Sequence, residues 1–218
     1  MPVAAVVFDM DGVLIDSEQV WAAAREELAR ETGGRWAEDT QARMMGMSSP
    51  EWSRYMHDEL GVPMEPAEIS GAVVERLERR YREHLPLLPG AREAVERSAA
   101  RWPLAVASSS NRPLIDLVLD LAGLARFFRV TVSSEEVARG KPAPDVYLEA
   151  ARRLDVDPDS CTAVEDSTNG ILAAHAAGMR VIAVPRRDYP PDPEALACAA
   201  VVLDFLDQLT PEVIGSSS

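Results

Sequence analysis

The most informative segment of this chain is Val3-Ala4-Ala5-Val6-Val7-Phe8, followed directly by Asp9-Met10-Asp11-Gly12-Val13. Six apolar residues with three valines and one aromatic ring are typical of a buried β-strand. Two carboxylates at i and i+2 follow, and like charges held this close need a cation or a shared proton. Mg²⁺ prefers oxygen ligands, so it would neutralise this pair and leave room for phosphate and water. A solvated Asp-Gly turn explains the segment equally well at this point.

Composition restricts the class of protein. The 218 residues are 47% hydrophobic and 27% charged, which is typical of a globular chain, and the length fits one large domain or a medium domain with an insert. No apolar run approaches the roughly 20 residues that span a bilayer, and no signal-peptide pattern is present. A net charge of −14 opposes binding to nucleic acids and anionic membranes. Cys161 and Cys198 do not make a disulfide framework, so we expect a cytoplasmic protein, and we expect a monomer.

The basic residues are strongly biased. Of the 22, all but one are arginines, and the exception is Lys141. A lysine ammonium is a compact point charge on a flexible stem, whereas arginine is a wide planar fork. Lys141 is therefore retained either by chance or because arginine would not fit.

Residues 17–85 have a helical pattern throughout. Helices are predicted after Ser17, which can cap the first of them, at about 50–60 and at about 66–84. The third contains Ile69, Val73, Leu77 and Tyr81 at i+4 spacing. Residues 35–50 give no clear pattern. The proline-rich stretch 85–90 is typical of a linker.

From Gly90 onward, helices alternate with strands. Strands are predicted at 104–107, 128–132, 161–164, 180–184 and 200–203, and helices at 91–101, 113–124, 144–154 and 168–177. Such alternation indicates parallel βαβ units with helices on both faces of the sheet. We therefore predict an α/β protein whose doubly wound, mostly parallel, Rossmann-like sheet comprises residues 1–16 and 86–218. Residues 17–85 form an inserted all-helical cap domain.

Polar groups follow four of the predicted strands. Ligands of doubly wound sheets bind outside the carboxyl ends of the strands, and these groups are Asp9 and Asp11, Ser108-Ser109-Ser110-Asn111, Gly140-Lys141-Pro142, and Glu165-Asp166-Ser167. A helix cap, a surface lysine and a loop acid pair are the ordinary explanations, but all of them would be needed at once. Hydroxyls and backbone N–H groups at a helix N-terminus bind phosphate. The four groups together therefore indicate a single site.

These groups carry a resemblance to a known family. The sequence resembles the haloacid dehalogenase-like superfamily, in its β-phosphoglucomutase-like branch with a small helical cap. Four motifs match in order: Asp9-Met10-Asp11-Gly12-Val13, Ser108, Gly140-Lys141-Pro142-Ala143-Pro144-Asp145, and Val164-Glu165-Asp166-Ser167-Thr168-Asn169-Gly170. The match covers nearly the whole chain, and the set of four is specific although each motif alone is weak.

The resemblance implies a role for each residue. Asp9 would be the nucleophile that takes the phosphoryl group, and Asp11 would protonate the leaving oxygen and then activate water. Mg²⁺ would be held by Asp9, the backbone carbonyl of Asp11 and Asp166, with Glu165 beside the metal. Ser108, the backbone at Ser109 and Lys141 would bind the phosphoryl group. A carboxylate that attacks a phosphate dianion needs such cations to offset the repulsion.

Several activities within the family compete. Dehalogenases of this fold lack the second aspartate, and phosphonate-cleaving relatives use a cap lysine that this cap does not contain. Mutases keep a histidine on the first cap helix, where this chain has Trp21, and an arginine after the glycine of the cap loop, where it has none. These differences favour a phosphatase acting on a small phosphorylated metabolite such as a sugar phosphate. A β-phosphoglucomutase-type mutase is the alternative, and a non-catalytic binding protein is a third interpretation.

The cap is expected to supply specificity. The residues predicted to face the substrate are Trp21, Met45, Gly46 and Met47. Helix packing between cap and core explains each of them equally well. Trp21 and Met47 indicate a pocket less polar than a bisphosphate would need. The loop at 188–197 has no predicted role beyond connecting strands.

Overall fold

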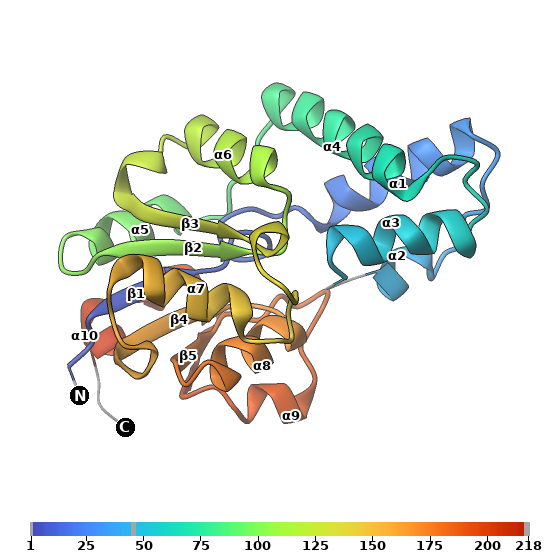
Figure 1. Cartoon of the computed structure of the whole chain (residues 1–218). Coiled ribbons are helices and arrows are strands. Elements are labelled where there is room, and N and C mark those ends of the chain that lie inside the picture. Colours follow the sequence, from blue (N-terminus) through green and yellow to red (C-terminus); the bar gives the residue numbers. More distant parts are fainter. Residues whose placement is uncertain (1, 45–46, 216–218) are drawn as a thin grey trace.

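A computed structural model of the chain describes residues 2–44 and 47–215. A six-stranded parallel sheet lies at its centre, with the strand order β3-β2-β1-β4-β5-β6 (Figure 1). The strands are β1 Ala5–Phe8, β2 Leu104–Ser108, β3 Phe128–Ser133, β4 Cys161–Glu165, β5 Arg180–Ala183 and β6 Val201–Val202. Every predicted strand is present, and the doubly wound α/β fold is confirmed. The order reverses between β1 and β4, which is where such sheets bind ligands.

Both faces of the sheet are covered by helices, because alternate side chains of β1 point to opposite sides. Val6 and Phe8 lie in a buried cluster with residues of α5 Ala91–Ala99, α6 Arg112–Leu121 and α10 Pro211–Gly215. Ala5 and Val7 lie in a second cluster with residues of α7 Asp145–Leu154 and α8 Thr168–Ala176. The second face consists largely of alanine, which lets α7 approach the strands closely.

Some short elements were not predicted from the sequence. They are α2 Thr40–Met44, α9 Pro193–Leu196, α10 and the 3₁₀ helices η1 Ala125–Phe127, η2 Ser134–Glu136, η3 Pro158–Ser160 and η4 Leu206–Gln208. Each is five residues or shorter, so the apolar periodicity that identifies a helix has no room to appear.

Four helices form a separate unit beside the sheet, shown in blue to bluish green in Figure 1. They are α1 Glu18–Glu31, α2, α3 Ser49–Asp58 and α4 Pro66–Glu83. The four apolar residues predicted for α4 are all buried. Ser17 precedes α1, as predicted. The prediction that its side chain caps the helix is wrong, because the buried hydroxyl has no hydrogen-bond partner among the described residues.

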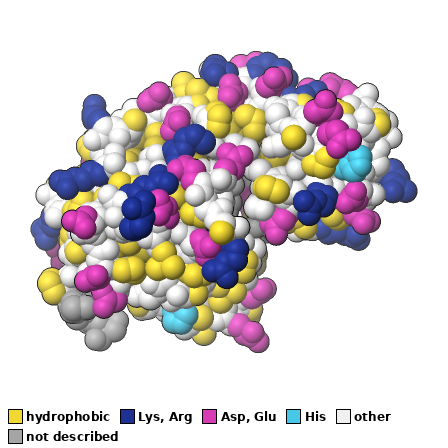
Figure 2. Space-filling view, in the orientation of Figure 1, with side chains coloured by type: hydrophobic (Ala, Val, Ile, Leu, Met, Phe, Trp, Pro, Cys, Tyr) yellow, Lys and Arg dark blue, Asp and Glu magenta, His cyan; other side chains and the backbone are white. Residues whose placement is uncertain are grey.

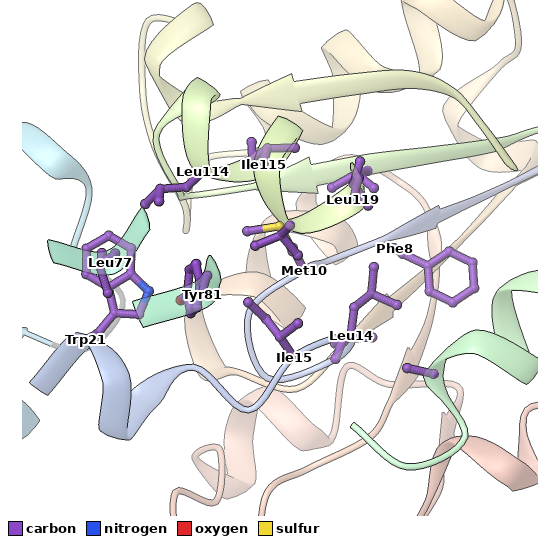
Figure 3. Packing of buried hydrophobic residues seen from close by; sticks show 14 of the residues in the cluster. Phe8, Met10, Leu14, Ile15, Trp21, Leu77, Tyr81, Leu114, Ile115 and Leu119 are labelled. Atoms are coloured by element: carbon purple, nitrogen blue, oxygen red, sulfur yellow. The ribbon is translucent and has the colours of Figure 1, made fainter. Parts of the chain in front are cut away.

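Two chain segments connect this unit to the sheet and pair with each other. The Asp16 N–H donates to Pro86 O at 2.8 Å, and the Leu88 N–H donates to Leu14 O at 2.9 Å. α4 also packs against α6. Figure 3 shows Leu77 and Tyr81 of α4 near Leu114 of α6, within one continuous apolar cluster. The unit is therefore joined to the sheet by a paired hinge and an apolar contact.

Charges of both signs are mixed over the face seen in Figure 2, without a broad basic area. Among the described residues, none of the helices is both long enough and apolar enough to cross a membrane.

Candidate active site

The turn after β1 brings the first acids to the carboxyl edge of the sheet. The Asp9 N–H donates to Val164 O at 3.0 Å, which fixes Asp9 beside the end of β4. Gly12 has φ +81°, and a Cβ there would lie 1.9 Å from Asp166 Oδ2. A side chain at this position would be strained and would displace Asp166. The glycine of the first motif therefore lets Asp166, which follows β4, approach the turn after β1.

Glu165, the last residue of β4, is completely buried and accepts five hydrogen bonds. Its Oε1 accepts from Lys141 Nζ at 2.6 Å and from Tyr147 OH at 2.8 Å. Its Oε2 accepts from the Asp166 N–H, the Ser167 N–H and Ser167 Oγ. A Cβ on Gly170 would lie 1.7 Å from Oε1, so the carboxylate fits under α8 only because this residue is glycine.

Lys141 joins the acids of two strands. Its Nζ lies 2.8 Å from Asp9 Oδ1 and 2.6 Å from Glu165 Oε1, and 5.0 Å from the centre of the Tyr147 ring. Burial alone would lower the pKa of Lys141, but the two carboxylates outweigh it and raise this pKa above its ordinary value. Lys141 therefore stays charged. The structure thus places the single lysine between Asp9 and Glu165.

The second acid, Asp11, accepts hydrogen bonds from three side chains. Ser110 Oγ donates to Asp11 Oδ2 at 2.7 Å, Ser108 Oγ donates to the same oxygen at 3.3 Å, and Trp21 Nε1 donates to Asp11 Oδ1 at 3.3 Å. Ser109 lines the cavity beside them. Ser110 was not among the predicted site residues, although it belongs to the polar stretch that was noted after β2.

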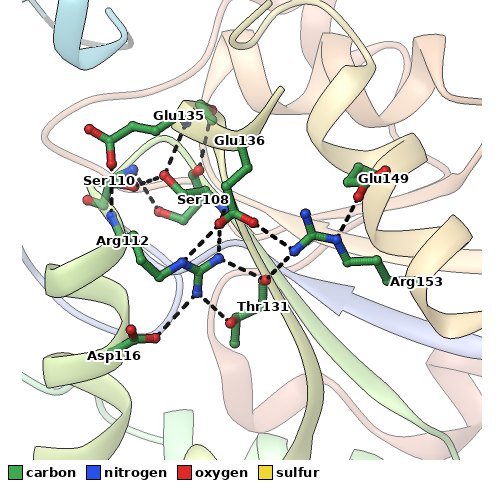
Figure 4. A network of polar contacts seen from close by, with 11 residues as sticks. Ser108, Ser110, Arg112, Asp116, Thr131, Glu135, Glu136, Glu149 and Arg153 are labelled. Atoms are coloured by element: carbon green, nitrogen blue, oxygen red, sulfur yellow. Dashed lines mark hydrogen bonds and ion pairs between the residues drawn. The ribbon is translucent and has the colours of Figure 1, made fainter. Parts of the chain in front are cut away.

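A polar network with residues at the end of β3 fixes the loop after β2 (Figure 4). Ser133 Oγ donates to Ser110 O at 2.7 Å, and Asn111 Nδ2 donates to Glu135 Oε1 at 2.6 Å. Asn111 Oδ1 also accepts from Ser49 Oγ of α3 at 3.0 Å. This asparagine therefore contacts both the sheet side and the four-helix unit.

Three acids form a cluster with room for a cation. Asp9, Glu165 and Asp166 each place a carboxylate oxygen within 4.8 Å of the other two. Burial raises the pKa of Asp9 to about 8, although Lys141 opposes the rise. Burial, together with Glu165 and Asp9, raises the pKa of Asp166 well above its ordinary value. Burial would also raise the pKa of Glu165, but Lys141 outweighs it and this pKa is lowered. The cluster has more negative charge than Lys141 can balance, so it fits a divalent metal.

A cavity of about 340 Å³ lies between the strand ends and the four-helix unit. From the sheet side it is lined by Asp9, Asp11, Ser109, Ser110, Lys141 and Asp166, and from the helical unit by Glu18, Trp21, Arg25, Met44, Met47 and Trp52. The structure thus brings the predicted Trp21 and Met47 to the cavity that contains Asp9. Met45 and Gly46 lie outside the described residues.

Several lining residues were missed by the sequence analysis. Arg25 and Trp52 lie in helices whose patterns indicated only packing or solvent exposure. Tyr189, Pro190 and Pro191 come from the loop at 188–197, for which no role beyond connecting strands was predicted, and they line the cavity. Tyr147 was also missed, and its burial behind Lys141 gave no local signal.

Comparisons with known proteins agree with this geometry. The family model of the haloacid dehalogenase-like hydrolases matches residues 3–178. Hexitol phosphatase B from Escherichia coli strain K12 is 37% identical over 214 residues, which cover 95% of each chain. The phosphorylated carbohydrates phosphatase of Thermotoga maritima is 35% identical over 180 residues, covering 82% of this chain and 83% of that protein.

Among solved structures, CbbY from Rhodobacter sphaeroides in complex with phosphate superimposes with a TM-score of 0.85 and 29% identity. The match covers 95% of this chain and 96% of that one. The resemblance found in the four motifs is therefore confirmed over nearly the whole chain. This chain belongs to the haloacid dehalogenase-like hydrolases, and it is a phosphoric monoester hydrolase of that family.

Proposed function

We propose that this enzyme is a Mg²⁺-dependent phosphatase that hydrolyses a small sugar or sugar-alcohol phosphate through an aspartyl-phosphate intermediate. The observation that carries this proposal is the convergence of Asp9, Asp11 and Lys141 on one wall of the cavity. The names of two relatives, hexitol phosphatase B and phosphorylated carbohydrates phosphatase, support the substrate class.

In the first half of the reaction, a carboxylate oxygen of Asp9 attacks phosphorus and the bond to the substrate oxygen breaks. Asp11 gives its proton to that leaving oxygen. In the second half, Asp11 takes a proton from a water molecule that attacks phosphorus, and the bond to Asp9 breaks. Splitting hydrolysis in this way is nucleophilic catalysis. Lys141, Ser108 and the backbone at Ser109 hold the phosphoryl oxygens, and the ammonium offsets the repulsion between two anions.

The acidic cluster would hold Mg²⁺ through Asp9, Asp166 and the backbone carbonyl of Asp11. A bound Mg²⁺ would neutralise negative charge on the nucleophile and on the phosphoryl group. Glu165 was expected among the metal residues, but we assign it to positioning Lys141. Its two oxygens already accept five hydrogen bonds, which leaves little lone-pair capacity for a cation.

We further propose that residues 17–85 are the cap and that residues 1–16 and 86–218 are the core. The paired segments at Asp16 and Pro86 support these boundaries, because the chain crosses between the two parts only there. Closure of such a cap would keep the intermediate from bulk water.

Trp21 supports hydrolysis over the mutase alternative. It occupies the position at which the family's mutases keep a histidine, and its Nε1 donates to Asp11 Oδ1. An indole N–H is only a donor, so this side chain cannot exchange protons with Asp11 as an imidazole can.

The proposal is tested by phosphate release from a panel of phosphorylated metabolites, with Mg²⁺ and with EDTA. We expect metal-dependent release that is lost in Asp9→Asn and kept in Asp39→Asn, a matched variant at an exposed cap residue. If the protein releases no phosphate but interconverts hexose 1- and 6-phosphates, the mutase alternative replaces the proposal. If it does neither, the non-catalytic interpretation replaces it.

We also place this enzyme in the cytoplasm as a monomer. The two cysteines, Cys161 and Cys198, are both free thiols in the structure, which agrees with a reducing compartment.

A further inference from the structure

Arg25 of α1 is a buried cation on the cap side of the cavity. The residue is only 5% exposed, and it lines the same cavity as Asp9. Its guanidinium carbon lies 4.6 Å from the centre of the Trp21 ring and 4.8 Å from that of Trp52. Aromatic faces attract a cation, but they leave its N–H groups without hydrogen-bond acceptors.

The hydrogen bonds of Arg25 are far from complete. A guanidinium has five N–H donors. Among the residues that the structure describes, the guanidinium forms one hydrogen bond, from Nη1 to Gln41 Oε1 at 3.2 Å, and its buried Nε has no partner there. Within residues 2–44 and 47–215, no carboxylate lies within 4.0 Å of this guanidinium. By contrast, Arg76 and Arg80 of α4 form direct ion pairs with Glu31 and Glu27.

Glu18 completes the polar wall beside Arg25. Gln41 Nε2 donates to Glu18 Oε2 at 3.0 Å, so the amide connects the cation to the anion. Glu18 also lines the cavity. The wall therefore offers N–H donors from Arg25 and carboxylate acceptors from Glu18, next to two indole rings.

This arrangement selects among possible ligands. A hydroxyl group both donates and accepts, so a chain of hydroxyls can bond to Arg25 and to Glu18 at once. A second phosphate or a carboxylate only accepts, and it would meet the Glu18 carboxylate.

We propose that Arg25, held by Gln41 and paired with Glu18, forms the subsite that binds the hydroxyl-rich end of the substrate, opposite the phosphoryl group. This proposal rests on the phosphatase function and identifies the residues that determine its specificity. It adds one buried charge to a pocket that Trp21 and Met47 indicated to be less polar than a bisphosphate would need.

The test compares two substrates of equal length, a hexitol 6-phosphate and hexyl phosphate, which carries no hydroxyls. We expect Arg25→Gln to lower the kcat/KM ratio of hexitol to hexyl phosphate by about 10- to 100-fold, as for the loss of hydrogen bonds to a charged group. Arg25→Lys keeps the charge but not the planar fork, so it should lose most of the ratio too. Arg43→Gln, at an exposed arginine of the same unit, should leave the ratio unchanged.

Binding measurements separate this proposal from the proposed function. Calorimetry in an Asp9→Asn background should show tighter binding of hexitol phosphate than of hexyl phosphate, and addition of Arg25→Gln should remove the difference. If wild type hydrolyses neither compound but this binding pattern holds, the phosphatase function fails and the subsite stands. Circular dichroism and thermal unfolding show whether each variant folds, and the lysine variant gives the answer if the glutamine variant does not.

Three results would overturn the subsite. One is a preference for hexitol phosphate that survives Arg25→Gln. Another is the absence of any preference for it over hexyl phosphate in wild type. The third is a stronger preference for a hexose bisphosphate that Arg25→Lys retains, which would assign Arg25 to a second anionic group instead.

Discussion

A buried cation lies in each of the two walls of the cavity, Lys141 on the sheet side and Arg25 on the side of the helical unit, and these two cations differ in their partners. On the sheet side, Lys141 contacts the carboxylates of Asp9 and Glu165 within 2.8 Å. On the cap side, Arg25 has one amide oxygen and two aromatic faces. Both cations are more than nine-tenths buried, so the difference is not one of exposure.

The different pairing of the two cations suits two different functions. A buried polar network whose members are all paired is rigid and specifies one geometry, which suits a nucleophile that must always meet phosphorus in the same way. Donors left without partners cost free energy until a ligand supplies acceptors. This difference supports the two proposals, in which the sheet wall carries the reaction and the wall formed by the helical unit discriminates among substrates.

The largest expected effect on activity comes from removing the charge of Lys141, the cation on the sheet side. Lys141→Met should lower kcat by about 10²–10³, since it removes a charge that faces the transferring group. Lys141→Arg should lose activity as well, because the wider fork does not fit between two carboxylates. Steady-state phosphate release measures both. Arg43→Lys, the reverse exchange at an exposed site, should leave kcat unchanged. If Lys141→Arg is fully active, the compact shape of the lysine side chain is not required between Asp9 and Glu165.

The same substitution in α8 and in α4 compares the packing of the sheet side with that of the helical unit. Gly170→Ala in α8 would place a Cβ against the buried Glu165 carboxylate, so we expect a loss of about 2–3 kcal/mol in the free energy of unfolding. Gly71→Ala in α4 meets nothing within 4 Å, and it should instead stabilise the protein by about 0.5–1 kcal/mol. Urea denaturation measures both variants. Equal changes in the free energy of unfolding at the two sites would show that the close contact between Gly170 and Glu165 does not contribute to stability.

Asn111 tests the connection between the two walls. Asn111→Ala removes the bonds to Ser49 and Glu135 and leaves the buried Ser49 hydroxyl without an acceptor, so the free energy of unfolding should fall by about 1–2 kcal/mol. Denaturant unfolding gives this value. Ser70→Ala is the control, because the Ser70 contact to Asn111 is 3.5 Å long and should contribute less than about 0.5 kcal/mol. A larger loss in the control would mean that α4, not α3, makes the connection.

The smallest effect is expected at the surface. Glu149 accepts hydrogen bonds from Arg152 and from Arg153, and Figure 4 shows the contact with Arg153. These hydrogen bonds lower the pKa of Glu149 to about 2. A lowered pKa means that the stabilisation is present above the ordinary value of 4.5 and is lost as the pH falls toward 2. Because the pair is near the surface, Glu149→Gln should cost less than about 1 kcal/mol at pH 7. The difference in the free energy of unfolding between wild type and variant should be smaller at pH 3 than at pH 7. A larger difference at pH 3 would mean that the pKa of Glu149 is not lowered by folding.

Much of the sheet side could be predicted from the sequence. The apolar run before Asp9, the alternation of helices and strands, and the single lysine are local signals, and parallel strands bring their carboxyl ends to one edge of the sheet. Once the strands are identified, the proximity of Asp9, Lys141 and Asp166 therefore follows from topology.

The cap side depended on tertiary structure. Arg25 stands before Glu26 and Glu27 in a charged run that is typical of an exposed helix face. In the structure, Trp21 of α1 contacts Trp52 of α3, and Arg25 is buried against both rings. Tyr189 and Pro190 come from a loop without a local pattern, and Tyr147 is behind Lys141 because α7 packs close to an alanine-rich face. The sequence by itself determined the strands and the reactive edge, since those depend on short-range periodicity. The wall that faces the substrate was decided by contacts between segments distant in the chain, which no local pattern records.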